Sequence, residues 1–356
     1  MFDLNRLINI KPFSMPQAEK AALYGDALGD LTRHHYANCP QYRRILDALG
    51  FDPAVKRPVR DMPFIPVRLF KDYELMSVER SRIIKTMTSS GTTGGSVSRI
   101  FLDRTTASNQ TKALARIVSD FIGEKRLPML IIDAKKTLSD RNLFSARGVG
   151  ILGFSMMGRD ITYALDDDMA IDLDSVKGFC GRHKDEEVML FGFTYMIWEY
   201  LYKKLSGARA APTFENAVLF HGGGWKRLGE QAVDNATFKR SLGEACGIGR
   251  VHNYYGMVEQ TGSIFMECEK GYLHSSIFSD IIIRDTGFEA RGMRETGLAQ
   301  LISLLPMSYP GHSILSEDIG EIIGEDDCPC GRLGRYFRIH GRAREAEIRG
   351  CSDAYL

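Results

Sequence analysis

The chain has 356 residues, of which 44% are hydrophobic, and its 46 lysines and arginines nearly balance its 45 aspartates and glutamates. A chain of this length forms one large core or two ordinary domains, since single cores stop growing at roughly 250–300 residues. The balanced charge gives no reason to expect nucleic acid or an anionic membrane surface as a partner.

The first twenty residues contain no continuous apolar segment, and no run of about 18 apolar residues occurs anywhere in the sequence. We therefore expect neither a signal peptide nor a membrane-spanning helix, and we predict a cytoplasmic protein. The seven cysteines are an odd number in a chain far too long to be a small disulfide scaffold. In a reducing compartment they are expected as free thiols, metal ligands or nucleophiles.

Residues 16–48 carry apolar side chains at helical spacing, which predicts a helical N-terminal lobe, and a proline-rich segment then breaks the pattern. Apolar runs bounded by turns follow, with a helical and aromatic segment at 194–205 that we interpret mainly as core. The runs are 129–132, 188–191, 217–220 and 251–254. This alternation is typical of an α/β protein with buried parallel strands.

After about Asp280 the helical spacing gives way to β-like runs interrupted by glycines, at 281–283, 298–305 and 319–323. We expect a smaller β-rich portion there, with mixed or antiparallel strands. No internal repeat and no low-complexity tract divides the sequence. We therefore predict one compact main unit over residues 1–340, followed by a mobile arm over residues 341–356.

Residues 88–98, with the sequence TSSGTTGGSVS, gather hydroxyl groups and glycines in one short loop. Backbone N–H groups and hydroxyls of such a loop can converge on phosphate oxygens, so the composition predicts a phosphate-binding loop. It is not a Walker A loop, because the Gly-Lys-Ser/Thr ending is missing. Taken alone, the same composition also fits a flexible surface loop.

Three further segments follow in order, and such an ordered set is hard to obtain by chance: NYYGMVEQ at 253–260, SEDIG at 316–320 and GRAREAEIRG at 341–350. Together with the loop they resemble the adenylate-forming superfamily. Within it the chain is most similar to phenylacetate-CoA ligases and to the acyl-protein synthetases of bacterial fatty-acid reductase systems. The resemblance covers residues 88 to 351. It implies an adenylation domain over 1–340, and a hinge with a truncated C-terminal lid over 341–356.

This resemblance implies an ATP-dependent, AMP-forming ligase that activates a carboxylic acid, and most closely a fatty acid. Gly223 and Gly224 would then lie against adenine, and Tyr255 would stack near it. Glu259 would bind Mg²⁺, Asp318 would accept both ribose hydroxyls, and Arg342 would act at the hinge. The implied ATP- and AMP-binding residues are Thr88, Ser89, Ser90, Gly91, Thr92, Thr93, Gly94, Gly223, Gly224, Asn253, Tyr254, Tyr255, Gly256, Glu259, Asp318 and Arg342.

The sequence departs from the superfamily in its loop and at its end. Gly95 and Ser96 stand where a lysine usually follows the phosphate loop, and Arg344 replaces the usual hinge aspartate. The lid, with its catalytic lysine, is expected to be absent. Acyl-protein synthetases carry the acyl group on a cysteine near the C-terminus, and Cys351 matches that position. We predict that Cys351 takes the acyl group from acyl-AMP and is catalytic together with Glu259 and Arg342. The alternative is a free thiol on a frayed tail.

Four further residues, Cys268, His274, Cys328 and Cys330, offer three thiols and one imidazole, which satisfy a closed tetrahedral zinc site. Similar positions occur in some relatives of phenylacetate-CoA ligases. We therefore predict a structural Zn²⁺ without a catalytic role, and the alternative is a set of unconnected thiols.

Two other functions stay open. The chain could be an acyl-CoA or aryl-CoA ligase that releases a free thioester, or a degenerate nucleotide-binding partner of a reductase complex that catalyses nothing. The expected partners are a carboxylic acid and an acyl-acceptor protein such as a reductase. A serine hydrolase is disfavoured, because no Gly-x-Ser-x-Gly nucleophile follows the HGGG sequence at 221–224.

Overall fold

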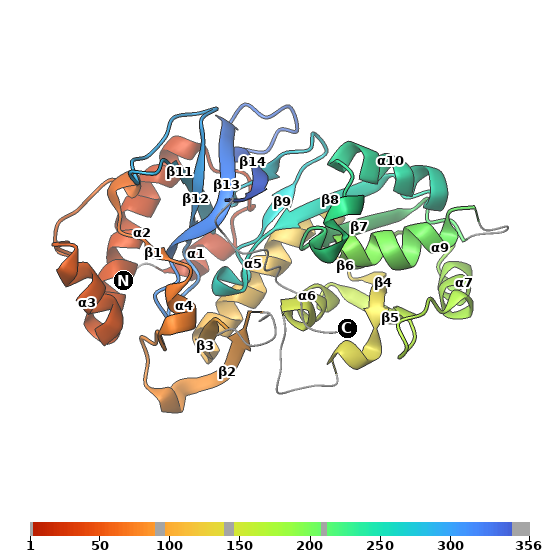
Figure 1. The fold of residues 1–356 in the computed structure, drawn as a ribbon, viewed down its shortest axis with the longest axis horizontal. Helices are drawn as coiled ribbons and strands as arrows, with labels where there is room; N and C mark the ends of the chain where they lie inside the picture. The colour runs from red at the N-terminus through yellow and green to blue at the C-terminus, as the bar shows by residue number, and fades with distance from the viewer. Residues whose placement is uncertain (1–2, 90–96, 139–145, 208–211, 344–356) are drawn as a thin grey trace.

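The computed structural model describes residues 3–89, 97–138, 146–207 and 212–343, and these residues form one mixed sheet of 12 strands with helices packed around it (Figure 1). The strand order is β11-β12-β13-β14-β10-β9-β8-β7-β6-β4-β5, and β1 pairs with β13. The strands β2 and β3 form a separate hairpin. The α/β fold with parallel and mixed portions that the sequence predicts is confirmed.

The elements have the following bounds. The strands are β1 Ile65–Pro66, β2 Ile83–Thr88, β3 Arg99–Asp103, β4 Leu127–Ala134, β5 Gly158–Leu165, β6 Val188–Phe193, β7 Ala217–Gly222, β8 Arg250–Tyr255, β9 Phe265–Glu267, β10 Leu273–His274, β11 Ser279–Arg284, β12 Thr296–Ser303, β13 Ser313–Glu325 and β14 Arg335–Arg342. The helices are α1 Leu4–Ile8, α2 Gln17–Asn38, α3 Pro40–Ala48, α4 Leu69–Asp72, α5 Arg104–Ile122, α6 Ala146–Ser155, α7 Leu173–Arg182, α8 Thr194–Met196, α9 Lys203–Leu205 and α10 Asn235–Cys246. A π-helix, η4 Ile197–Tyr202, joins α8 to α9, and shorter 3₁₀ turns include η6 Val258–Gln260.

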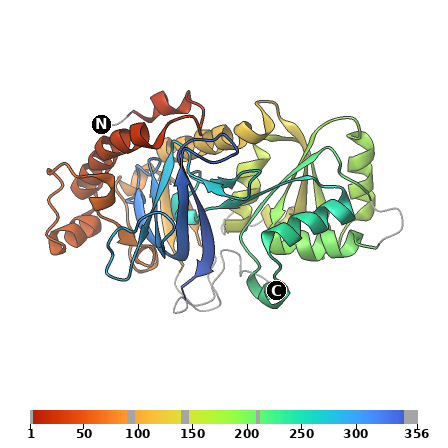
Figure 2. The same ribbon diagram turned by 90° about the horizontal axis from the view of Figure 1, so that it is seen from above.

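One half of the sheet, β5-β4-β6-β7-β8, is entirely parallel. Every residue of β4, β6 and β7 is buried, as expected for strands covered by helices on both faces. Figure 2 shows these covering layers, with α10 on one side of the sheet and α5 on the other. The four apolar runs predicted as parallel strands lie inside β4, β6, β7 and β8, so that prediction is confirmed.

The other half, from β9 to β11, is antiparallel and pairs through β10, β14, β13 and β12. The β-rich portion predicted after Asp280 is confirmed. The strand β13 begins at Ser313, six residues before the predicted apolar run. The sequence pattern missed this part because Ser316, Glu317 and Asp318 interrupt the run. The strand β14 continues to Arg342, so the division proposed at residue 341 stays a prediction.

The predicted N-terminal helices are present as α2 and α3, and polar contacts fasten α2 to the antiparallel half. The N–H of Gln17, at the first turn of α2, donates to both carboxylate oxygens of Asp326, at 3.1 and 2.9 Å. The buried Lys20 ammonium donates to the Ser275 hydroxyl at 3.0 Å and lies 3.8 Å from Asp280. These partners, which are distant in the sequence, give hydrogen bonds to an N–H group at the start of a helix and to a buried ammonium, both of which would otherwise lack a partner.

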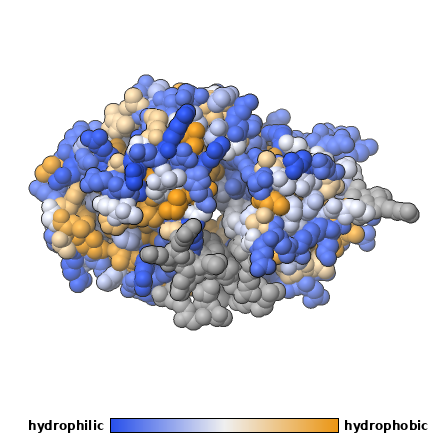
Figure 3. Space-filling model, turned by 45° about the horizontal axis from the view of Figure 1, so that its top comes forward, coloured by the Kyte–Doolittle hydropathy of each residue, from blue (hydrophilic) through white to orange (hydrophobic). Residues whose placement is uncertain are grey.

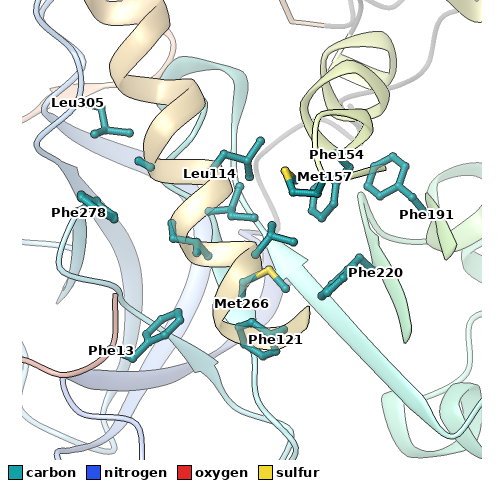
Figure 4. Close-up of a cluster of buried hydrophobic side chains, with 14 of the residues drawn as sticks. Phe13, Leu114, Phe121, Phe154, Met157, Phe191, Phe220, Met266, Phe278 and Leu305 are labelled. Atoms are coloured by element: carbon teal, nitrogen blue, oxygen red, sulfur yellow. The ribbon is translucent and has the colours of Figure 1, made fainter. Parts of the chain in front are cut away.

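The main hydrophobic core surrounds α5, which lies between the two halves of the sheet (Figure 4). The Asp103 carboxylate accepts the Thr106 N–H at 2.8 Å and so caps the start of α5. Leu114 and Phe121 of this helix are buried within the core. Phe154 stacks on Phe191 with ring centroids 4.4 Å apart, and the aromatic segment 194–205 is helical and largely buried as predicted.

The face of the molecule seen in Figure 3 is mostly hydrophilic, with apolar side chains gathered mainly on the left of the view. Within the described parts of the chain, every helix is either too short or too polar to cross a bilayer.

Candidate active site and metal centre

Two hydrogen bonds join the two ends of the predicted phosphate loop, which connects β2 to β3. The N–H of Ser89 donates to the Ser98 carbonyl at 3.1 Å, and the N–H of Ser98 donates to the Ser89 hydroxyl at 2.9 Å. Thr88 ends β2 immediately before this pair. The rest of the predicted loop lies outside the described residues: Ser90, Gly91, Thr92, Thr93 and Gly94.

Glu259 is a buried carboxylate next to this closure. Its side chain is 4% exposed, and burial raises the pKa of the Glu259 carboxyl. The Ser98 hydroxyl beside it, and the charges of Lys71 and Arg342, act in the opposite direction on that pKa. The backbone is held as well, because the Tyr309 hydroxyl donates to the Glu259 carbonyl at 2.8 Å. A desolvated carboxylate of this kind is suited to hold a cation.

Asp318 and Arg342 face each other across β13 and β14, with their Cα atoms in register. The Tyr255 hydroxyl donates to Asp318 Oδ2 at 2.6 Å, and Arg342 Nε lies 3.9 Å from Asp318 Oδ1. Burial raises the pKa of the Asp318 carboxyl, while the bond from Tyr255 and the charge of Arg342 lower it. The carboxylate keeps free lone pairs for a ligand, because each of its oxygens can accept more than one hydrogen bond.

Two glycines follow β7 where the chain turns. Gly223 has a φ of +80° and Gly224 a φ of +66°, a region that favours glycine. A Cβ on Gly223 would lie 2.4 Å from Cδ1 of Phe193, so the Phe193 ring fills the space beside Gly223. A Cβ on Gly224 would meet no described atom within 4 Å, so of the two glycines it is Gly224 that borders open space.

The next strand, β8, supplies the other predicted nucleotide contacts. The Asn253 N–H donates to Glu267 Oε2 at 2.9 Å. The Tyr254 ring packs against the core, with its centroid 5.3 Å from that of Phe154. The Tyr255 hydroxyl is bonded to Asp318, as described above, and Gly256 follows where a Cβ would lie 3.2 Å from Ile264 Cγ2.

The structure thus brings Glu259, Asp318 and Arg342 together with the closure of the phosphate loop. Cys351, the predicted nucleophile, lies outside the described residues. Sequence reasoning missed Tyr309 and Glu267, which bond to the backbone of Glu259 and of Asn253. Glu267 is 2% exposed, accepts from Asn235, and lies 3.0 Å from the Lys239 ammonium. Each is a single polar residue in an apolar or charged stretch, and no local motif marks it.

The four predicted metal ligands converge in one place at the opposite end of the β13–β14 hairpin. The ligand atoms of Cys268, His274, Cys328 and Cys330 all lie within 4.8 Å of one another. The sulfurs of Cys268 and Cys328 are 3.9 Å apart, and Cys330 Sγ lies 3.4 Å from His274 Nε2. Tetrahedral zinc, with Zn–S bonds of about 2.3 Å, places two sulfurs roughly 3.8 Å apart. The donor set and its spacing fit that ion.

Each cysteine turn also has the backbone of a metal-binding turn. The N–H of Lys270 donates to Cys268 Sγ at 3.4 Å, and the N–H of Arg332 donates to Cys330 Sγ at 3.5 Å. Gly331, with a φ of +82°, closes the second turn. Such N–H groups stabilise a thiolate once a metal is bound. Burial raises the pKa of the Cys328 thiol to about 12, so without a cation this thiol stays neutral.

Comparison with known proteins gives one family match and several relatives. Residues 3–355 match the family described as acyl-protein synthetase, LuxE. A long-chain-fatty-acid–luciferin-component ligase from Vibrio harveyi is 21% identical over 328 residues, covering 90% of this chain and 84% of that protein. A phenylacetate-coenzyme A ligase from Thermus thermophilus is 34% identical over 87 residues, and the match spans 23% of this chain and only 20% of that ligase.

The fold has a counterpart among solved structures. The open conformation of a 2-hydroxyisobutyryl-CoA ligase, in complex with 2-HIB-AMP and CoA, is similar with a TM-score of 0.68. The similarity covers 94% of this chain and 77% of that one, at 17% sequence identity. At this identity the comparison establishes the shared fold.

Proposed function

The chain belongs to the LuxE acyl-protein synthetase family, and from that membership we propose that it activates a long-chain fatty acid with ATP and transfers the acyl group to its own Cys351. The observation that carries the proposal is the buried carboxylate of Glu259 beside the Ser98 hydroxyl, at the closed end of the phosphate loop. A fatty acid as substrate is supported by the Vibrio harveyi relative, which is a long-chain-fatty-acid ligase.

In the first step a carboxylate oxygen of the acid attacks the α-phosphorus of ATP. A new O–P bond forms, the bond to pyrophosphate breaks, and acyl-AMP results. The acid is already ionised at neutral pH, so the site needs no side-chain base. Its residues act by positioning and by neutralising charge. Glu259 would hold Mg²⁺, which neutralises charge on the phosphates when bound.

The remaining nucleotide contacts belong to the same proposal. Asp318 would accept the ribose hydroxyls while Tyr255 and Arg342 hold its carboxylate in place, and the support is the contacts that these two residues make with it. The adenine ring would lie against the turn of Gly223 and Gly224, where Gly224 borders open space.

In the second step the Cys351 thiolate attacks the acyl carbonyl. The C–S bond forms, the bond to the AMP oxygen breaks, AMP leaves, and the thiol proton goes to solvent. A cysteine thioester then presents the acyl group to an acceptor protein. We propose a fatty-acid reductase as that acceptor, on the strength of the family membership.

The test is ATP–pyrophosphate exchange across a panel of fatty, aromatic and amino acids, followed by labelling with radioactive acid. We expect exchange only with fatty acids, and a hydroxylamine-sensitive label on wild type that is lost in Cys351→Ser while exchange persists. A coenzyme A thioester made without any label on Cys351 would select a free acyl-CoA ligase instead. ATP binding without exchange for any acid would select a degenerate nucleotide-binding partner.

We further propose that the cysteine and histidine cluster holds a structural Zn²⁺, which ties the β9–β10 turn to the β13–β14 turn. The support is the convergence of four ligand atoms from two distant segments. Elemental analysis of protein purified without chelators should give about one zinc per chain. A zinc content far below that would refute the proposal.

A cytoplasmic location completes the proposal. It is supported by the six cysteines of the described residues, all of which are free thiols. Fractionation of the producing cells, followed by immunoblotting, would test it, and recovery of the protein outside the cytoplasm would contradict it.

A further inference from the structure

Helix α4, which the sequence analysis assigned no role, is fastened beside the carboxylate of the candidate active site. Just before it, β1 pairs with the start of β13, and the Val67 N–H donates to the Leu315 carbonyl at 2.9 Å. The fully buried Phe70 ring packs edge-on against Tyr309, with centroids 6.1 Å apart. Tyr309 in turn holds the Glu259 carbonyl. Figure 1 shows α4 below β13 and next to β3, the strand that follows the phosphate loop.

Lys71 follows Phe70 directly, and the contact of Phe70 with Tyr309 places this turn of α4 beside the Glu259 backbone. Its side chain is partly buried, and its positive charge acts on the Glu259 carboxyl and lowers that group's pKa. In the residues that the structure describes, the Lys71 ammonium has no ion pair. The nearby acids on the same segment are taken by arginines: Asp72 lies 3.8 Å from Arg68, and Glu74 pairs with Arg80 and Arg99.

The proposed reaction benefits from a further cation near the phosphates, besides the Mg²⁺ that Glu259 would hold. Negative charge builds up on the pyrophosphate as it leaves the α-phosphorus, and enzymes stabilise it with lysine, arginine or a metal ion. Residues 88–98 contain no lysine or arginine, so a protein cation for this charge has to come from another segment.

We propose that Lys71 binds the β- and γ-phosphates of ATP, and the pyrophosphate that leaves, beside Glu259. The inference rests on the proposed function, because it requires ATP at this site. Lysine serves here as a point charge, which tolerates the varied geometry of a phosphate chain. Lys71 then contacts the substrate from α4, and this short helix becomes part of the active site.

The experiment measures binding of ATP, pyrophosphate and AMP by calorimetry, with Mg²⁺ present, for wild type, Lys71→Met, Lys71→Arg and Lys56→Met. Lys56 is an exposed lysine earlier in the chain and serves as the matched control. Lys71→Met should weaken ATP and pyrophosphate binding about tenfold and leave AMP binding within about twofold. Lys71→Arg should restore most of the loss, and Lys56→Met should match wild type.

Three results would overturn the inference. Equal weakening of ATP and AMP in Lys71→Met would indicate a merely structural role for the lysine. Unchanged ATP affinity in Lys71→Met would remove Lys71 from the phosphate site while leaving the proposed function intact. Failure of wild type itself to bind ATP would refute the proposed function and this inference together. If Lys71→Met does not fold, the same comparison is made with Lys71→Gln.

Discussion

The hairpin of β13 and β14 carries a different site at each end, and the two sites differ in the way their polar atoms are satisfied. At the turn, Cys328 and Cys330 meet Cys268 and His274, and Cys268 is completely buried. At the open end, Asp318 and Arg342 are 23% and 36% exposed. The two ends lie roughly 20 Å apart along the strand.

The difference separates a permanent ligand from an exchanging one. At the turn, the soft ligand atoms face each other and a cation would satisfy all of them at once. At the open end, Asp318 already has partners in Tyr255 and Arg342, and it stays within reach of solvent. A buried set of four converging ligand atoms suits an ion that never leaves, whereas a paired and accessible carboxylate suits a nucleotide that comes and goes.

The largest effect is expected from a variant that removes one proposed metal ligand at the turn of the β13–β14 hairpin. Cys328→Ser removes one of four ligands, so zinc should be lost and the free energy of unfolding should fall by about 3 kcal/mol. Elemental analysis and urea unfolding measure the two effects. Cys180→Ser, at a partly buried thiol outside the cluster, should keep its zinc. An unchanged zinc content in Cys328→Ser would refute the metal assignment.

The second prediction concerns Asp318, at the open end of the β13–β14 hairpin. Asp318→Asn removes the charge that we propose accepts the ribose hydroxyls, so ATP affinity should fall by a factor on the order of 10² while the zinc content stays unchanged. Calorimetry measures the affinity. Glu321→Gln, three residues further along β13, serves as the control and should bind ATP as wild type does. A loss of zinc in Asp318→Asn would show that the two ends are not independent.

The third prediction concerns His312, which directly precedes β13. It tests whether this buried histidine stays neutral in the folded protein at mildly acidic pH. Its ring stacks on His35 at 4.9 Å, its Nε2 lies 3.1 Å from the Thr32 hydroxyl, and the charge of His34 also acts on it. Burial lowers the pKa of His312 to about 3, whereas in the unfolded chain histidine has a pKa of about 6.5.

Below about pH 6.5 the unfolded chain therefore takes up a proton that the folded chain refuses. Stability is complete above that pH and falls as the pH drops towards 3. At pH 5 the protonation of His312 in the unfolded chain lowers the free energy of unfolding by about 2 kcal/mol. Urea unfolding at pH 7 and pH 5 should show a pH dependence that is smaller by about this amount in His312→Gln. An identical pH dependence in the two proteins would contradict the account.

The smallest effect is expected from Tyr255, which supports Asp318 at the open end of the hairpin. Tyr255→Phe removes the 2.6 Å hydrogen bond to Asp318, so ATP affinity should fall about tenfold. The pKa of the Asp318 carboxyl should rise further, because this bond holds it down. Calorimetry at several pH values measures both. A loss as large as that in Asp318→Asn would contradict the supporting role given to Tyr255.

Much of the fold could be predicted because its parallel strands are continuous apolar runs. β4, β6 and β7 are buried on both faces, so every residue in them obeys the same constraint. The hairpin of β2 and β3 escaped prediction, since Lys85 and Thr86 interrupt its pattern. The edge strand β5 escaped for the same reason, because Arg159 and Asp160 are exposed.

The candidate site could be predicted where its residues lie in short motifs, as Glu259 and Asp318 do. The cysteines could be grouped with His274 from their number and type together with the resemblance to relatives of phenylacetate-CoA ligases. Tyr309 and Glu267 could not be predicted, because each acts on a residue far away in the sequence and carries no local signal. Lys71 belongs to the same class, because no local motif links it to Glu259 and it is the packing of α4 against Tyr309 that brings the two segments together.

The central claim is that Glu259 serves an adenylation reaction, and fatty-acid-dependent ATP–pyrophosphate exchange tests it most directly. Glu259→Gln keeps the size of the side chain and removes its charge, so the exchange rate should fall by a factor on the order of 10² or more. Glu321→Gln should exchange at the wild-type rate. Exchange by Glu259→Gln at the wild-type rate would contradict the account, since the buried carboxylate would then have no part in the chemistry.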